Sequence, residues 1–190
     1  MHAGPRPRTA LLLMDLQQSI LQNYPDGGLL ERIRTALAAA RRAALPVVWV
    51  RVCFRPGYPE VSPHNVRFSE VRQTGRLLES DPGSDIHPSL DVQPQDVVVT
   101  KRRIGAFAGS DLEVVLRAAG IESLVLAGVA TSGVVLSTVR LAADMDYRLT
   151  VLADGCADGD PEVHRVLTEK VFPRQATVQT VGAWVDSLSG

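Results

Sequence analysis

One stretch of the chain, residues 124–143, most constrains how the protein can fold. Its sequence is LVLAGVATSGVVLSTVRLAA. The apolar start is typical of a strand, the glycine, threonine and serine residues after it predict a turn, and a helical apolar spacing begins at about Gly133. In an open parallel sheet such a corner lies at the carboxyl edge of the strands, where ligands bind. Because its backbone amides can hold negative charge, we expect the active site here.

Six apolar runs of strand length lie along the chain and alternate with helical patterns. We predict strands over residues 9–15, 47–52, 96–100, 123–127, 149–153 and 176–181. Continuous apolar runs suit a parallel sheet that is covered on both faces. The alternation therefore predicts an α/β fold, Rossmann-like and doubly wound, with a mostly parallel six-stranded sheet in the order 2-1-3-4-5-6 and helices on both faces.

Apolar spacing and capping residues predict where the helices lie. A stripe at spacings of three and four predicts a helix over residues 30–44. A capping box from Ser110 to Glu113 opens a helix that Gly120 closes, and Asp160 before a proline opens another that runs to about residue 171. We also predict helices over residues 133–145 and at the C-terminus. Residues 53–69 hold three prolines and one glycine, so we predict a long surface loop, with at most a short helix over residues 70–74 in the irregular segment after it.

Composition limits the domain count and the partners. With 190 residues, 45% of them hydrophobic, the chain can bury one core, so we expect one domain at residues 9–190 after a flexible tail at residues 1–8. The net charge of −1 favours a small-molecule substrate over nucleic acid or a membrane surface. The apolar run at residues 10–14 is too short for a signal or membrane segment. Two cysteines, Cys53 and Cys156, form no disulfide framework, so we expect a cytoplasmic protein.

Two opposite charges stand at predicted strand ends. Asp15 ends the first strand and Lys101 follows the third. Facing an anion-binding turn, the pair could work as an acid–base site, in which Lys101 holds Asp15 ionised or binds an anionic substrate. The alternative is that both side chains only face water at the ends of their strands.

Three sequence blocks resemble the signature blocks of the isochorismatase-like, or cysteine hydrolase, superfamily. They read LLLMDLQ at residues 11–17, VVTKRRIGAF at 98–107, and GVAT at 128–131 with LST at 136–138. The superfamily is doubly wound α/β and includes nicotinamidases, N-carbamoyl amidohydrolases and isochorismatases. The resemblance implies that Asp15 is a general acid or base, that Lys101 orients it, and that a non-proline cis peptide bond joins Val129 to Ala130 and helps to build an oxyanion hole. The turn residues of that hole are Val129, Ala130, Thr131, Ser132 and Gly133.

The chain departs from the family pattern at the position of the catalytic cysteine. That position is held by Val134, which has no nucleophilic atom, so no acyl-enzyme can form on it. Isochorismatases that split a vinyl ether also lack this cysteine, and we therefore expect vinyl-ether hydrolysis by acid–base chemistry. The alternatives are a catalytically silent member that binds a small molecule or serves as a subunit, and a C–N amidohydrolase with a displaced thiol, Cys53 or Cys156. Thr131 and Ser132 are weaker substitutes because no histidine lies near them in the sequence.

Four further residues are candidates for substrate binding. Arg55 could clamp a carboxylate with its planar guanidinium, although it could equally be a solvated loop residue. The other candidates are Gln17, Tyr58 and Phe107, of which Phe107 could instead pack in the core. We expect no metal and no cofactor, because the Asp-x-His arrangement of nicotinamidases is missing after the second strand and the loop residues His64 and His87 lack ligand spacing. The resemblance also implies a homodimer or homotetramer.

Overall fold

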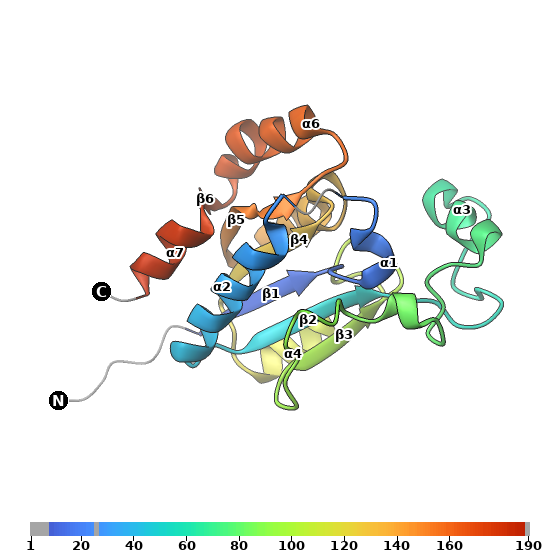
Figure 1. The fold of residues 1–190 in the computed structure, drawn as a ribbon, viewed down its shortest axis with the longest axis horizontal. Coiled ribbons are helices and arrows are strands. Elements are labelled where there is room, and N and C mark those ends of the chain that lie inside the picture. The colour runs from blue at the N-terminus through green and yellow to red at the C-terminus, as the bar shows by residue number, and fades with distance from the viewer. Residues whose placement is uncertain (1–7, 25–26, 189–190) are drawn as a thin grey trace.

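The protein has an α/β fold built on one six-stranded sheet (Figure 1). The computed structural model describes residues 8–24 and 27–188, so residues 1–7 of the predicted tail lie outside the described part. Arg8, the last residue of that tail, already joins the fold, because its carbonyl accepts hydrogen bonds from the amides of Glu122 and Ser123. The strands are β1 Thr9–Met14, β2 Val47–Val52, β3 Val97–Lys101, β4 Ser123–Val129, β5 Arg148–Ala157 and β6 Thr177–Gln179.

Helices connect the strands. They are α1 Gln18–Leu21, α2 Leu29–Arg42, α3 Val66–Thr74, α4 Leu112–Ala118, α5 Leu136–Asp144, α6 Pro161–Val166 and α7 Val181–Ser187. Short 3₁₀ helices lie at Pro82–Ser84 and Phe172–Arg174, and π-helical turns at Thr131–Val135 and Leu167–Val171. No helix in the described part of the chain is long and apolar enough to cross a membrane.

The fold class is confirmed, but one strand has a different place in the sheet. All strand pairs are parallel, and the order is β3-β2-β1-β4-β5-β6. The predicted order put the third strand between the first and the fourth, whereas β3 lies at the edge, beyond β2. Edge position explains why Val97 and Val98 are 38% and 43% exposed although they belong to an apolar run. An apolar run alone does not tell an edge strand from a central one.

Successive residues of β1 supply the two faces of the sheet, as the pleat of a strand requires. Leu11 and Leu13 pack under α2 and α7, in a core that includes Ile33 and Trp184. Ala10, Leu12 and Met14 pack on the other face, under α4 and α5. Figure 1 shows α2 in front of the sheet and α4 behind it. Both faces are thus covered, which is why the β1 run is apolar throughout.

The segment between β2 and β3 contains more helix than predicted. The helix α3 begins at Val66, four residues before the expected start, because the side chain of Asn65 accepts a hydrogen bond from the amide of Phe68 and caps it. Residues from this segment form a small core of their own with the end of β2. Figure 1 shows α3 beyond the edge toward which the arrows of β1 and β2 point. The members of this core are Val52, Phe54, Tyr58, Val61, Phe68 and Leu77.

Other element ends also differ from the predictions. The helical segment predicted from Gly133 begins two residues earlier, in the π turn, and β5 continues four residues past the predicted end at residue 153. The predicted capping box is not formed, because the hydroxyl of Ser110 accepts from the amide of Leu112 rather than from that of Glu113. The predicted cap at Asp160 is present, since its carboxylate accepts from the amides of Glu162 and Val163.

Gly128 lets β4 approach β1 closely at the carboxyl edge. Its φ is 144°, and a Cβ atom on it would lie 2.1 Å from the carbonyl oxygen of Met14. Met14 and Gly128 are partners in the parallel ladder, directly before Asp15 and the predicted turn. Glycine is therefore required where the two strands present their carboxyl ends.

We expect Gly128→Ala to lower the free energy of unfolding by roughly 3 kcal/mol or more, because the added methyl group must push the two strands apart. Urea denaturation measures this. The matched control is Gly159→Ala, where no atom lies within 4 Å of the added Cβ and which should change stability by less than about 0.5 kcal/mol. Equal stability losses in the two variants would contradict the close approach at Gly128.

Candidate active site

The carboxyl edge brings together Asp15, Lys101 and the π turn. Asp15 follows β1, and the turn follows β4, which is the neighbour of β1. Lys101 ends β3, two strands away from β1, where it is paired in register with Val52 of β2. Its long side chain crosses this distance, and the Lys101 Nζ atom lies 2.9 Å from Asp15 Oδ2. The predicted pair is therefore formed, although its strands are not neighbours as expected.

Asp15 is a buried carboxyl group with one oxygen unsatisfied. The residue is 7% exposed, and its φ of 56° is a left-handed conformation that aspartate tolerates better than most residues. Oδ2 contacts Lys101, whereas Oδ1 is buried and has no hydrogen-bond partner in the described structure. Burial raises the pKa of Asp15 and outweighs the opposing effect of the Lys101 charge. Asp15 therefore holds a proton over a wider pH range than an exposed aspartate does.

The ammonium group of Lys101 has acceptors for all three of its protons. Besides Asp15 Oδ2, Nζ donates to the carbonyl oxygens of Arg103 at 3.0 Å and Ile104 at 2.8 Å. The side chain is almost completely buried. An ammonium group has three N–H donors, so none remains for a bound molecule. Lys101 can orient Asp15 and fix a positive charge beside it, but it is not placed to hold a substrate anion directly.

The loop that supplies these two carbonyl oxygens is fastened to α5. The amide of Ala106 donates to the hydroxyl of Thr138, which is completely buried, at 3.1 Å. A Cβ atom on Gly105 would lie 3.2 Å from the Cβ of Ser137. The second and third sequence blocks are therefore in contact, and the third block helps to place the carbonyls that hold Lys101.

The π turn lies on the other side of the site. The Val129–Ala130 peptide bond is cis, as expected from the family resemblance. The side chain of Val134 is buried in the core with Val135 and Met14. Three amides of the turn already have acceptors, because those of Gly133 and Val135 donate to the carbonyl of Ala130 and that of Ser132 donates to Asp158. Only the other amides of the turn could bind negative charge on a substrate.

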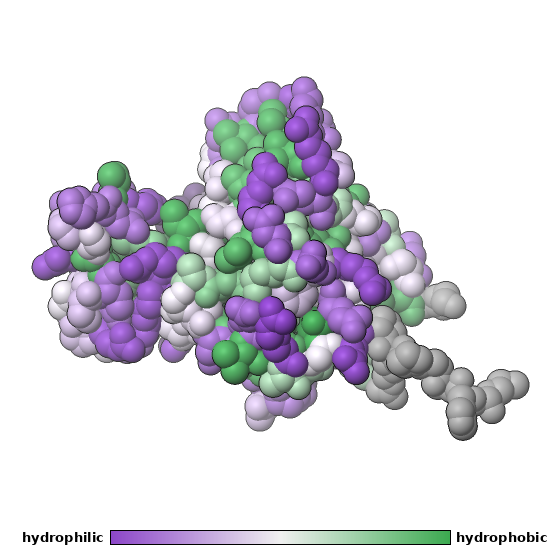
Figure 2. Space-filling model, turned by 180° about the vertical axis from the view of Figure 1, so that it is seen from behind, coloured by the Kyte–Doolittle hydropathy of each residue, from purple (hydrophilic) through white to green (hydrophobic). Residues whose placement is uncertain are grey.

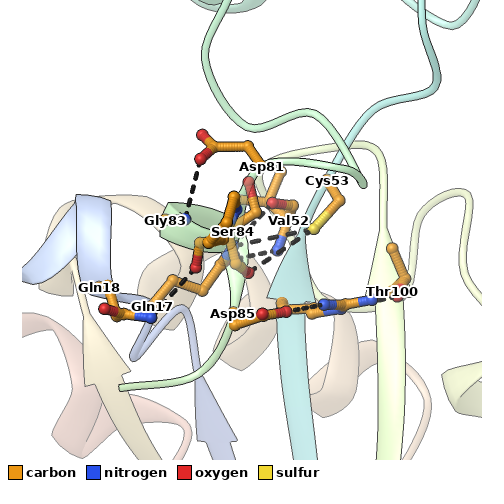
Figure 3. Close-up of polar contacts among 11 residues, drawn as sticks. Gln17, Gln18, Val52, Cys53, Asp81, Gly83, Ser84, Asp85 and Thr100 are labelled. Atoms are coloured by element: carbon orange, nitrogen blue, oxygen red, sulfur yellow. Dashed lines mark hydrogen bonds and ion pairs between the residues drawn. The ribbon is translucent and has the colours of Figure 1, made fainter. Parts of the chain in front are cut away.

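The side chain of Gln17 is buried and hydrogen-bonded to backbone groups of the protein. Its amide nitrogen donates to the carbonyls of Val52 and Ser84, and its side-chain oxygen accepts from the amide of Val52 (Figure 3). Gln17 is completely buried and joins the end of β2 to the 3₁₀ helix at Pro82–Ser84. These three bonds occupy most of its amide, so Gln17 positions strand ends around the site.

The other predicted substrate residues make their contacts away from the Asp15–Lys101 pair. Arg55 pairs with Glu60 at 2.6 Å and lines a broad groove along β3. The hydroxyl of Tyr58 donates to the carbonyl of Arg76 inside the small core of the β2–β3 segment. Phe107 packs in the main core, with its ring centre 6.1 Å from that of Tyr147.

A cavity of about 250 Å³ lies beside α1 and the start of α2, and Tyr24 is among the residues that line it. Burial raises the pKa of Tyr24, and the charges of Asp158 and Asp15 raise it further. His87 lines the same cavity. In the described part of the chain no group of three or more His, Cys, Asp or Glu side chains is arranged to hold a metal ion.

The sequence did not indicate two residues that contact the turn, His164 and Asp158. The hydroxyl of Thr131 lies 2.8 Å from Nδ1 of His164, and the amide of Ser132 donates to the carboxylate of Asp158 at 2.7 Å. No histidine lies near Thr131 in the sequence, as stated above, but the fold brings His164 into contact with it. His164 lies 33 residues after Thr131, in the last turn of the short helix opened by Asp160, and nothing in the sequence indicates that it contacts the π turn.

Removing one partner of the buried pair should lower the free energy of unfolding much more than removing both. Lys101→Met leaves a buried carboxyl group without its cation, so we expect the free energy of unfolding to fall by about 3–5 kcal/mol. The loss should grow as the pH rises, because Asp15 is then deprotonated without a partner. Denaturation curves of Lys101→Met and of Asp15→Asn with Lys101→Met test this. A double variant that is no more stable than Lys101→Met would contradict a coupled pair.

Both thiols should be unreactive in the folded protein. Cys53 and Cys156 are buried, and burial raises the pKa of each, that of Cys156 to about 12. The thiolate is the nucleophile, so alkylation by iodoacetamide near neutral pH should be negligible and should become complete after unfolding in guanidinium chloride. Mass spectrometry gives the readout. Rapid labelling of either thiol in the native state would restore the displaced-thiol alternative.

The sequence and the structure match known proteins along nearly their whole length. The isochorismatase domain family matches residues 9–183. The uncharacterized isochorismatase family protein YecD of Escherichia coli O157:H7 is 31% identical over 185 residues, which cover 95% of this chain and 96% of that protein. The ureidoacrylate amidohydrolase RutB of Pseudomonas savastanoi pv. phaseolicola is 31% identical over 221 residues, covering 99% and 86%.

The fold gives the same result. The structure of an isochorismatase family protein from Burkholderia thailandensis superimposes with a TM-score of 0.83 at 31% identity and covers 98% of both chains. The site described above lies in the three sequence blocks that resemble the family. The chain therefore belongs to the isochorismatase family of the cysteine hydrolase superfamily.

Proposed function

We propose that the protein hydrolyses a small, anionic molecule by acid–base chemistry in which Asp15 donates the proton and no covalent intermediate forms. Membership of the family supports a hydrolase. One observation carries the proposal beyond that: the buried carboxyl group of Asp15 contacts Lys101 through Oδ2, while Oδ1 is buried without a partner. A protonated Asp15 would carry its proton on Oδ1, where no protein group accepts it. The proposed reaction requires a bound substrate to reach this buried oxygen and to accept that proton.

The environment of Asp15 suits a proton donor. Its pKa is raised by burial, which keeps a carboxylic acid protonated closer to neutral pH, as a general acid requires. Lys101 lies on the opposite oxygen and stabilises the carboxylate that remains after the proton has left. Its three occupied donors keep it in that position, so it serves as a positioning residue for Asp15.

The absence of a nucleophile at position 134 supports direct attack by water. Valine cannot form an acyl-enzyme, and both thiols are buried with raised pKa values. Hydrolysis of a vinyl ether needs only a proton donor and a water molecule. We favour this reaction for that reason.

Asp15 donates its proton to the terminal alkene carbon, which converts the vinyl ether into an oxocarbenium ion. Water then adds to the cationic carbon and gives one proton back to the Asp15 carboxylate. The resulting hemiketal breaks its carbon–oxygen bond to the leaving alcohol, and the products are that alcohol and a ketone. The charge that develops in this route is positive, so the free amides of the π turn would bind the carboxylate of an anionic substrate.

A second candidate function is hydrolysis of a carbon–nitrogen bond without a thiol. The relative RutB, which covers nearly all of this chain, is named a ureidoacrylate amidohydrolase. In this reaction Asp15 would act as the base that activates water, and the same turn would bind the oxyanion. The third possibility is a silent member that binds a small molecule. The cytoplasmic location and the homodimer or homotetramer stay predictions.

A substrate screen over vinyl ethers, amides and ureido compounds tests the proposal. We expect turnover of a vinyl ether that falls by about 100-fold or more in Asp15→Asn, the loss typical of a missing general acid. The matched control is Asp186→Asn on α7, an exposed carboxylate that should leave the rate unchanged.

The pH profile separates the two roles of Asp15. If Asp15 donates the proton, kcat/KM falls as the pH rises through its raised pKa; if Asp15 is a base, kcat/KM rises over the same range. Turnover that is equal in wild type and Asp15→Asn would contradict both enzymatic functions. If the protein turns over none of the compounds, only the catalytically silent member that binds a small molecule remains of the three possibilities.

A further inference from the structure

A hydrogen bond between Thr131 and His164 joins the π turn to α6. Thr131 Oγ1 and His164 Nδ1 are 2.8 Å apart. Thr131 has no exposed surface, and His164 is half-buried. The contact is therefore closed to water on the side of Thr131 and partly open on the side of His164. A hydroxyl group without exposed surface cannot attack a substrate in place of the missing cysteine. Its partner can only be a group inside the protein, which here is the imidazole.

A second bond fastens the next residue of the turn to the same region. The amide of Ser132 donates to Asp158 Oδ2 at 2.7 Å, and Asp158 lies just before α6. Two consecutive turn residues are thus held by the segment from residue 158 to residue 164. The cis Val129–Ala130 bond directly precedes them. The orientation of the turn amides consequently depends on α6 as well as on β4.

The protonation state of His164 decides the direction of its bond to Thr131. A neutral imidazole with its proton on Nε2 accepts the hydroxyl proton of Thr131 at Nδ1, whereas an imidazolium ion must donate there. Burial lowers the pKa of His164, and the nearby charge of Asp158 opposes this. On α6 itself, the charged neighbours Glu162 and Arg165 are paired with each other. The π turn contributes no charged side chain to this contact.

We propose that His164 is a positioning residue whose neutral imidazole, together with Asp158, holds the π turn in the orientation that turnover requires. The proposal rests on the function proposed above, because it assigns to α6 the control of the amides in the same site. Protonation of His164 reverses the bond to Thr131 and loosens the turn. Activity should then fall at acidic pH for a reason that is separate from the titration of Asp15.

Four variants test the proposal with the vinyl ether that the screen identifies. His164→Leu and Thr131→Val each remove one partner and should lower kcat at least about tenfold with a smaller change in KM, because the turn amides are displaced. The double variant should lose no more than either single variant, since both remove the same bond. His164→Asn places an oxygen near the position of Nδ1 and should restore most of kcat. The control His64→Leu alters an exposed loop histidine and should change nothing.

The pH profile supplies a readout that a merely structural role would not move. In the wild type, kcat should decline as the pH falls through the lowered pKa of His164, and the midpoint should equal the pKa of His164 measured by NMR titration. In His164→Asn this acidic decline should be missing. An unchanged acidic decline in His164→Asn, or full activity in His164→Leu while Asp15→Asn is inactive, would overturn the inference and leave the proposed function standing. If the wild type turns over no compound, both proposals fall.

Discussion

The buried ion pair between Asp15 and Lys101 is the interaction on which the site depends. Two charges removed from water are stable only when they are paired and when their remaining donors and acceptors are satisfied. Lys101 meets this requirement through Asp15 and two backbone carbonyls, whereas Asp15 keeps one oxygen without a partner. The pair is therefore complete on the side of the cation and incomplete on the side of the acid, where Oδ1 is buried and has no partner in the described structure.

Much of the surrounding structure serves to hold this pair in place. Thr138 fastens the loop whose carbonyls bind Lys101, and Gln17 joins the ends of β1 and β2 to the segment after α3. Gly128 lets the strand that leads into the π turn lie close against the strand that ends at Asp15. These residues belong to the three sequence blocks that resemble the family. Their contacts explain why polar side chains lie in the interior of an otherwise apolar sheet edge.

The sequence was sufficient for the fold class and for the pair, and it was not sufficient for the way the strands are arranged. Apolar runs identify strands because the sheet is covered on both faces, and Asp15 and Lys101 stand where those runs end. The place of β3 at the edge depends on how the long segment after β2 crosses over, and Val97 and Val98 carry no signal of it. Arg55 follows a strand as predicted, yet its guanidinium group forms an ion pair with Glu60, five residues later. The contact between Thr131 and His164 joins positions 33 residues apart, so it depends on tertiary structure alone.

The ammonium group of Lys101 donates all three of its protons to groups inside the protein. The positive charge that acts on Asp15 is therefore separate from any group that recognises a substrate. Recognition of a substrate therefore has to come from residues other than Lys101. A chain built in this way could acquire a new substrate through changes in those other residues while the Asp15–Lys101 pair stays unchanged.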